Sequence, residues 1–131
     1  MAGIPADLRY SKEHEWVRME EAGEAVIGIT DFAQDQLGDV VFLDLPDEGV
    51  TITQFAKLGE IESVKSVSDL FAPISGTVLS RNQTAIDAPE LVNASPYEDG
   101  WLLRLRIADP AELDNLLSAE EYAAHVAQEQ H

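Results

Sequence analysis

The sequence predicts a mainly β protein, a flattened barrel or sandwich of two antiparallel sheets with a short internal helix and C-terminal helices. Two observations lead to this prediction. Short runs rich in apolar and β-branched residues recur along the chain, and glycine, proline, asparagine and aspartate separate them. Signals for the start of a helix occur once within the chain and twice near its C-terminal end. A length of 131 residues suits one domain, so residues 1–131 are expected to form a single domain.

The first long strands are expected to form a hairpin. Residues 15–19 alternate in polarity as a strand does, with Trp16 directed toward a core. The polar, glycine-containing segment 20–24 indicates a turn, and residues 25–29 are then the returning strand.

A short helix and two further strands are expected next. Asp31 is followed three residues later by Gln34, as in a capping box, and Gly38 resembles a C-terminal helix cap. These signals predict a helix of about two turns. The apolar run 39–45 predicts a strand, and residues 50–52 begin another one.

A second hairpin is expected around Lys65. Residues 59–64 change polarity with a period near two, which indicates a half-buried strand. The small polar segment 66–69 can hold a turn through bonds from its side chains to the backbone, and residues 71–79 resume as turn and strand. Lys65 is therefore predicted to stand exposed at the tip.

The C-terminal third combines a loop, a strand and helices. Residues 84–100 contain two prolines, an asparagine and a glycine, so they predict a loop with short extended pieces. Residues 101–107 alternate as a strand. Helix-start patterns at 109–112 and 118–121 predict a helical segment over about 109–128.

Composition excludes several classes of partner and site. With 8 basic and 25 acidic residues the formal net charge is −17, which repels nucleic acids and anionic membrane surfaces. The absence of cysteine excludes disulfides, a thiol nucleophile and cysteine-based metal sites. No apolar run has the ~18 residues of a membrane span, and residues 1–6 lack a signal pattern. A cytoplasmic monomer is expected.

Catalysis by the chain's own side chains is not expected. Neither a Gly-x-Ser-x-Gly motif nor a glycine-rich phosphate loop occurs. The histidines at positions 14, 125 and 131 lack the close spacing of a zinc site along the chain, so no metal site is predicted. His14 lies between two glutamates and is interpreted as a strand histidine paired with its neighbours Glu13 and Glu15, with a metal ligand as the alternative interpretation.

Lys65 is predicted to be a modification site. It is one of only three lysines, carboxylates flank it at Glu62 and Asp69, and a Pro-Ile-Ser-Gly segment follows at residues 73–76. A solvated surface lysine without a function is the alternative interpretation of any single exposed lysine.

The residues around this lysine resemble a known family. Residues 62–66, followed by 72–76, resemble the lipoyl-lysine hairpin of the H protein of the glycine cleavage system. The resemblance runs in order from Tyr10 to Tyr122 and includes residues 14–17, 28–34, 37–39, 45–46 and 93–101. Biotinyl carriers share the architecture but typically carry methionine on both sides of the lysine, whereas Val64 and Ser66 stand here. This difference favours lipoate.

The resemblance implies a carrier function with Lys65 as the covalent attachment site for lipoate. The arm would accept an aminomethyl group from a pyridoxal-phosphate glycine decarboxylase and pass it to a tetrahydrofolate-dependent aminomethyltransferase. A flavin (FAD) enzyme, dihydrolipoamide dehydrogenase, would reoxidise it. Glu62, Val64 and Ser66 are interpreted as recognition features for the lipoate-attaching enzyme.

The loaded arm would carry a cationic amine, which a carboxylate in a cleft could hold. Glu15 and Asp69 are the candidates, with a strand-surface glutamate and a turn-stabilising aspartate as the structural alternatives. Gln36 departs from the histidine that some relatives have at this place. Two other functions stay open: a lipoyl donor in lipoate relay, and an unmodified acidic adaptor.

Overall fold

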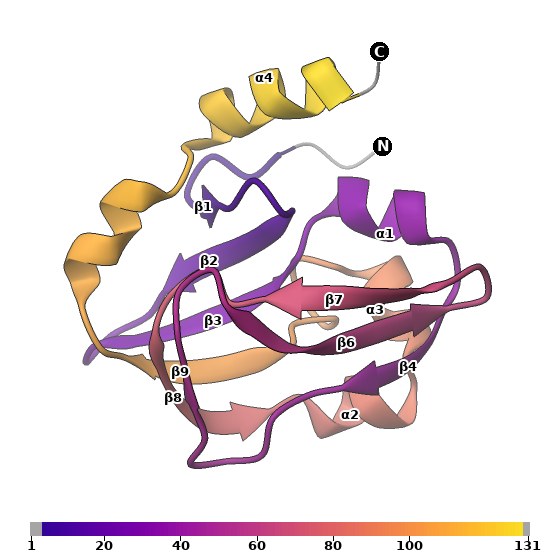
Figure 1. Cartoon of the computed structure of the whole chain (residues 1–131), viewed down its shortest axis with the longest axis horizontal. Coiled ribbons are helices and arrows are strands. Elements are labelled where there is room, and N and C mark those ends of the chain that lie inside the picture. The colour runs from indigo at the N-terminus through magenta and orange to yellow at the C-terminus, as the bar shows by residue number, and fades with distance from the viewer. Residues whose placement is uncertain (1–3, 130–131) are drawn as a thin grey trace.

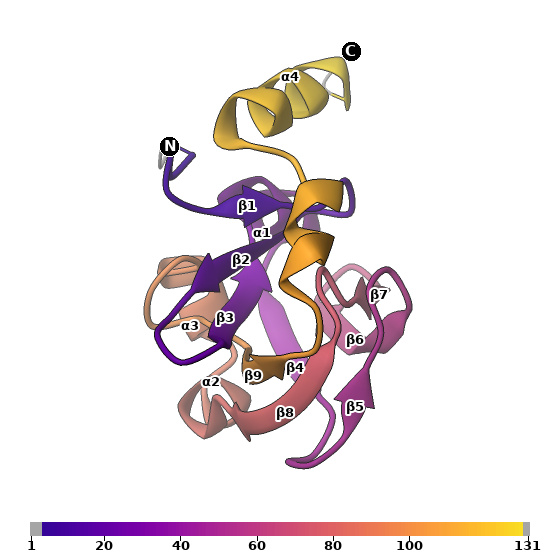
Figure 2. The same ribbon diagram turned by 90° about the vertical axis from the view of Figure 1, so that its left-hand side faces the viewer.

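The structure is a computed structural model that describes residues 4–129, and two antiparallel β-sheets form its body. This confirms the predicted fold class. The larger sheet has the strand order β1 (Arg9–Tyr10), β2 (Glu15–Met19), β3 (Glu24–Ile29), β9 (Leu103–Ile107), β8 (Gly76–Arg81) and β5 (Thr51–Ile52). The smaller sheet has the order β4 (Val40–Asp44), β6 (Lys57–Ser63) and β7 (Val67–Phe71). Figures 1 and 2 show the two sheets from perpendicular directions.

The main core lies between the two sheets. Each strand alternates its side chains between two faces, and the inward-facing positions are apolar. The larger sheet contributes Val17 and Leu105 to this core, and the smaller sheet contributes Leu43, Ile61 and Leu70, all of them buried. The two sheets therefore bury one common apolar layer, which holds the strands of the smaller sheet in place.

The short internal helix α1 (Asp31–Leu37) was predicted correctly, but its N-cap lies one residue earlier than expected. Thr30 is the cap, because its side-chain oxygen accepts a hydrogen bond from the Ala33 N–H at 3.2 Å. Asp31 instead lies in the first turn, where its carboxylate accepts a bond from the Gln34 side chain. The C-terminal cap at Gly38 is confirmed: its φ is 78° and its N–H donates to the Gln34 carbonyl.

The predicted hairpin around Lys65 is confirmed, with a shorter turn than expected. β6 and β7 pair antiparallel, and Glu62 lies opposite Val67. Residues 66–69 were predicted to be turn, but β7 already begins at Val67, because ladder bonds to β6 satisfy this polar segment. The connection between β6 and β7 protrudes at the edge of the molecule beside the segment that joins α1 to β4 (Figure 1).

The loop prediction for residues 84–100 was wrong. The structure has two short helices there, α2 (Gln83–Asp87) and α3 (Glu90–Ala94). The buried Asn82 caps α2, since its side-chain oxygen accepts a bond from the Ala85 N–H. Its side-chain amide also donates to two backbone carbonyls further along the segment. Tertiary anchoring thus folds a segment whose composition indicates turns.

The C-terminal segment is helical, as predicted. A 3₁₀-helix (Pro110–Asn115) starts at the expected cap Asp109, and α4 (Ala119–Glu129) follows. Ser118 and Glu121 form a reciprocal capping box before α4. α4 lies over the N-terminal segment (Figures 1 and 2), and the buried ring of Tyr122 stacks on Tyr10 at 4.7 Å. Within residues 4–129, no helix has the length and apolar character needed to span a membrane.

Candidate functional site

The hairpin tip is held in one shape by a buried serine. The Ser63 side-chain oxygen accepts hydrogen bonds from the backbone N–H groups of Lys65 at 3.2 Å and Ser66 at 3.3 Å. The Ser63 N–H donates to the Ser66 carbonyl at 2.8 Å. One further bond, from the Val64 N–H to the Asp39 carbonyl, fixes the tip to the segment after α1. The backbone that carries Lys65 is therefore anchored on both sides.

The Lys65 side chain lies over the C-terminal end of α1. A β-carbon built on Gly38 would stand 2.9 Å from the Lys65 Cε and 3.8 Å from its Nζ. The absence of a side chain at Gly38 therefore leaves the space that the lysine stem occupies. Lys65 is exposed and takes part in no ion pair among the described residues, whereas the Lys57 amine pairs with Glu60 and Asp69.

Replacement of Gly38 by alanine is expected to lower the free energy of unfolding by about 1–3 kcal/mol, because φ 78° and ψ −159° form a conformation nearly restricted to glycine. The new methyl group should also displace the Lys65 stem. Urea unfolding and the NMR shift of the lysine ε-methylene measure the two effects. Gly23→Ala is the matched control, since Gly23 has φ 73° but open space around it. An unchanged Lys65 signal in Gly38→Ala would contradict the contact.

A surface pocket of about 390 Å³ opens beside α1. One wall is α1, a second is formed by β6 and β7, and a third is the segment that leads into β2. Four residues singled out in the sequence line it together: His14, Glu15, Gln36 and Asp69. The end of α1 beneath Lys65 thus belongs to the same helix that forms one wall of the pocket.

Glu15 provides a buried carboxyl group in this pocket. The residue is 3% exposed, and its carboxyl oxygens accept hydrogen bonds from the Ser11 hydroxyl and the Phe71 N–H. Burial raises the pKa of Glu15 to about 8, and the hydrogen bonds from Ser11 and Phe71 oppose the shift only in part. The group is largely protonated at neutral pH and ionises easily once a cation approaches it.

Asp69 has a different environment. Its neighbour Leu70 is buried in the core, so strand alternation directs the Asp69 carboxylate to the outer face of the small sheet. There the carboxylate lies 3.1 Å from the Lys57 Nζ, and about half of the Asp69 side chain is exposed. The structure therefore brings Glu15 and Asp69 to one pocket, but only the Glu15 carboxyl group is buried away from solvent.

The predicted recognition residues Glu62, Val64 and Ser66 are all exposed at the tip. Sequence reasoning missed an apolar feature beside them. Phe42 on β4 and Val67 on β7 lie on either side of Glu62 in register, and both are more than half exposed. The apolar run 39–45 hid this feature, because an irregularity between Val40 and Phe42 interrupts the alternation of β4 and leaves Val41 and Phe42 both exposed.

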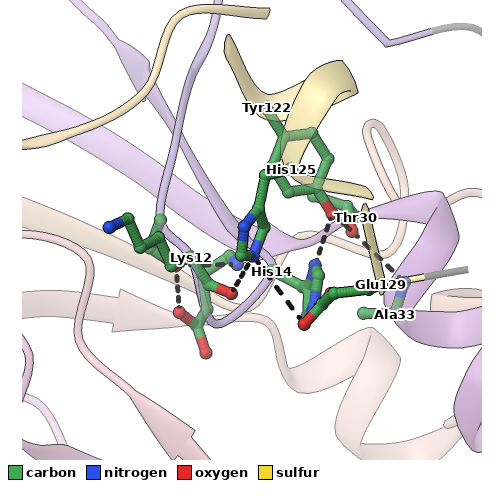
Figure 3. A network of polar contacts seen from close by, with 9 residues as sticks. Lys12, His14, Thr30, Ala33, Tyr122, His125 and Glu129 are labelled. Carbon is green, nitrogen blue, oxygen red and sulfur yellow. Dashed lines mark hydrogen bonds and ion pairs between the residues drawn. The ribbon is translucent and has the colours of Figure 1, made fainter. Parts of the chain in front are cut away.

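A polar network connects α4 to the rim of the pocket (Figure 3). The His14 Nδ1 lies 2.8 Å from the Tyr122 hydroxyl, and the His14 Nε2 lies 2.6 Å from a Glu129 carboxylate oxygen. Burial lowers the pKa of His14, which the Glu129 carboxylate partly opposes. His14 and Glu129 both line the pocket.

The sequence-based interpretation of His14 was wrong. The residue precedes β2 with a φ of 72°, and its ion pair is with Glu129 rather than with an adjacent glutamate. In the sequence, His125 was rejected as a metal ligand because of its distance from the other histidines, and Glu129 was not singled out. Their separation of four residues within a helical segment was the available signal, since it places both on one helix face.

The comparisons with known proteins agree in one family. A sequence model of the family described as glycine cleavage H-protein matches residues 8–129. The glycine cleavage system H protein of Symbiobacterium thermophilum is 55% identical over 124 residues, covering 95% of this chain and 96% of that protein. The H protein of Geobacillus thermodenitrificans is 57% identical over 123 residues, covering 93% and 95%. The crystal structure of a glycine cleavage system H protein from Mycobacterium marinum matches with a TM-score of 0.84 and 37% identity, covering 95% of this chain and 99% of that chain.

Proposed function

This chain belongs to the family of glycine cleavage H-proteins, and on that premise we propose that it is a carrier protein whose lipoyl group is attached to Lys65. The observation that carries the proposal is the exposed Lys65 amine at the end of a protruding hairpin, on a backbone that Ser63 holds in place. An attaching enzyme needs such an accessible amine. Glu62, Val64 and Ser66 offer it the surrounding surface.

The residues around Lys65 suit an attached acyl arm. Acylation removes a positive charge, and no carboxylate of the described residues loses an ion-pair partner when Lys65 is neutralised. The lysine stem already lies on Gly38, at the end of the helix that forms one wall of the pocket. An arm extended from this amine can therefore follow α1 toward Glu15.

When attached to Lys65, a lipoyl group would supply redox-active sulfur that can carry an aminomethyl group. The partners would be a pyridoxal-phosphate glycine decarboxylase, a tetrahydrofolate-dependent aminomethyltransferase and the FAD enzyme dihydrolipoamide dehydrogenase. The chain itself presents and shelters the arm, without a catalytic residue of its own.

Glu15 binds the cationic amine that enters the pocket. A nearby ammonium group lowers the pKa of the Glu15 carboxyl from about 8, so the carboxyl ionises and forms a charge-assisted hydrogen bond. The Ser11 hydroxyl and the Phe71 N–H hold the carboxyl in position during this change. Asp69 adds negative charge at the rim, although Lys57 partly neutralises it.

The proposal is tested by the intact mass of the full-length protein. We expect one lipoyl increment after incubation with a lipoate-attaching enzyme, lipoate and ATP, and a further aminomethyl increment after addition of glycine and the decarboxylase. An unmodified mass, under conditions that modify a known lipoyl domain, would contradict the carrier function and favour the unmodified adaptor. A lipoyl increment without loading would favour a role in lipoate relay.

A further inference from the structure

We propose that His14, His125 and Glu129 form a binding site for a divalent transition-metal ion such as Zn²⁺, at the contact between α4 and the segment that precedes β2. One ligand atom from each of these residues lies within 4.8 Å of the other two. Figure 3 shows the two imidazoles and the Glu129 carboxylate grouped together. The site lies away from the Lys65 hairpin, at the rim of the pocket that Glu15 also lines, and the binding of an ion there does not depend on the carrier function.

The donor set has the chemistry of a zinc site. Two imidazoles and one carboxylate are the three protein ligands of known open zinc sites, in which water takes the fourth position. Mg²⁺ and Ca²⁺ prefer oxygen donors and do not match two nitrogen ligands. His125 and Glu129 are four residues apart on one face of α4, and His14 reaches the same place from a remote part of the chain.

The distances are close to those a bound ion requires. Zn²⁺ binds nitrogen and oxygen ligands at about 2.0–2.2 Å, so the ligand atoms of a tetrahedral site stand roughly 3.4 Å apart. The His14 Nε2 lies 2.6 Å from one Glu129 oxygen, and the His125 Nε2 lies 3.7 Å from the other. Small side-chain rotations adjust both distances. The His125 Nε2 also lies 3.0 Å from the Lys12 carbonyl oxygen, a hydrogen bond that metal binding replaces.

A hydrogen-bond partner on the second ring nitrogen of His14 orients its imidazole, as is common for histidine ligands of metal ions. Its Nδ1 lies 2.8 Å from the Tyr122 hydroxyl, which in turn lies 2.7 Å from the Thr30 side-chain oxygen. Tyr122 is fully buried and stacks on Tyr10, so this support is rigid. An outer partner on one imidazole nitrogen orients the other nitrogen toward the ion.

The charge of the surroundings favours a cation. The chain has a net charge of −17, and Glu13 lines the same pocket as His14 and Glu129. A bound dication would link the C-terminal end of α4 to the rim of the pocket. Its expected effect is therefore to hold α4 against the body of the protein.

The test uses the full-length, tag-free protein produced without lipoate, so that it contains no thiol. We expect calorimetric titration with Zn²⁺ to give one bound ion per chain. The Co²⁺-bound protein should give an absorption spectrum that lacks the bands of sulfur ligands, and Zn²⁺ should raise the thermal unfolding midpoint. His125→Gln and Glu129→Gln should abolish all three signals. Tyr122→Phe keeps the stacked ring and should weaken binding about 10-fold or more, because it removes only the outer partner of His14.

Glu120→Gln is the matched control, since it changes a glutamate of the same helix outside the proposed ligand set. This variant should bind Zn²⁺ as the natural chain does. The thermal unfolding midpoints of the variants and of the natural chain are also compared without metal, so that a loss of Zn²⁺ binding caused by misfolding is recognised. If the natural chain takes up no Zn²⁺, or if His125→Gln binds it as tightly as the natural chain, the metal site is ruled out and the cluster is an ion pair only.

Discussion

Replacement of Lys65 by arginine is expected to abolish lipoyl attachment completely and to leave the free energy of unfolding almost unchanged. The arginine side chain stays protonated at all working pH values, so it offers no amine that can be acylated. Lys65 is exposed and makes no ion pair among the described residues, so the fold loses little with it. Intact mass and urea unfolding measure the two effects.

Lys57→Arg is the matched control for this prediction. Lys57 lies on the same hairpin and its amine is ion-paired with Glu60 and Asp69, whereas that of Lys65 is not ion-paired among residues 4–129. The control variant should take up one lipoyl group as the natural chain does. A lipoyl increment on Lys65→Arg, or its loss in Lys57→Arg, would show that another lysine is the attachment site.

Replacement of Glu15 by glutamine is expected to stabilise the protein at alkaline pH. The folded pKa of Glu15 is raised to about 8, above its ordinary value of 4.5. The unfolded chain therefore ionises this carboxyl as the pH rises past 4.5, while the folded state resists ionisation, so stability falls between pH 4.5 and 8. Since one pKa unit corresponds to about 1.4 kcal/mol, the loss amounts to a few kcal/mol.

Glutamine does not titrate, so the Glu15→Gln variant should lack this part of the pH dependence. Urea unfolding at pH 5 and pH 8, with a chelator present, should show a difference between variant and natural chain that grows by about 2–4 kcal/mol toward pH 8. Parallel pH profiles for the Glu15→Gln variant and the natural chain would contradict the raised pKa of Glu15.

The same substitution should impair the carrier. A glutamine cannot become a carboxylate when a cationic amine enters the pocket, so it forms only a neutral hydrogen bond. Water should therefore hydrolyse the aminomethyl group faster on the loaded Glu15→Gln variant than on the loaded natural chain, and the release of ammonia measures this reaction. The buried acid thus costs stability at high pH in the empty protein and contributes to binding when the amine arrives, as is common for groups with perturbed pKa values.

Local patterns predicted most of the fold. Period-two alternation identified the long strands, and the cap at Gly38 and the capping box at Ser118 fixed helix ends within a residue. The errors have a common physical origin. Asn82 caps α2 and also bonds to backbone carbonyls 17 and 19 residues further along the chain, and Val67 pairs with β6 although its neighbours suit a turn. The composition of neither segment indicates these bonds.

The candidate site could likewise be predicted only in part. The sequence surroundings of Lys65 predict it as the attachment site, and sequence patterns also single out Glu15, Gln36 and Asp69, which line one pocket. The sequence could not tell that Glu15 is buried while Asp69 is ion-paired on the outer face. It also could not bring His14 to α4, because the contact joins residues more than a hundred positions apart.

The anchoring of the hairpin tip by Ser63 has a consequence for the kinetics of the proposed carrier. Because hydrogen bonds hold the backbone at Lys65, the arm moves only by rotation about its own side-chain bonds. Its free end therefore stays within one arm length of a fixed attachment point. The pocket belongs to the same body, so the arm meets it at an effective concentration of about millimolar, as short flexible tethers provide. Each partner enzyme must then compete with the carrier's own pocket for the loaded arm, which favours transfer to the partner that binds the arm most tightly.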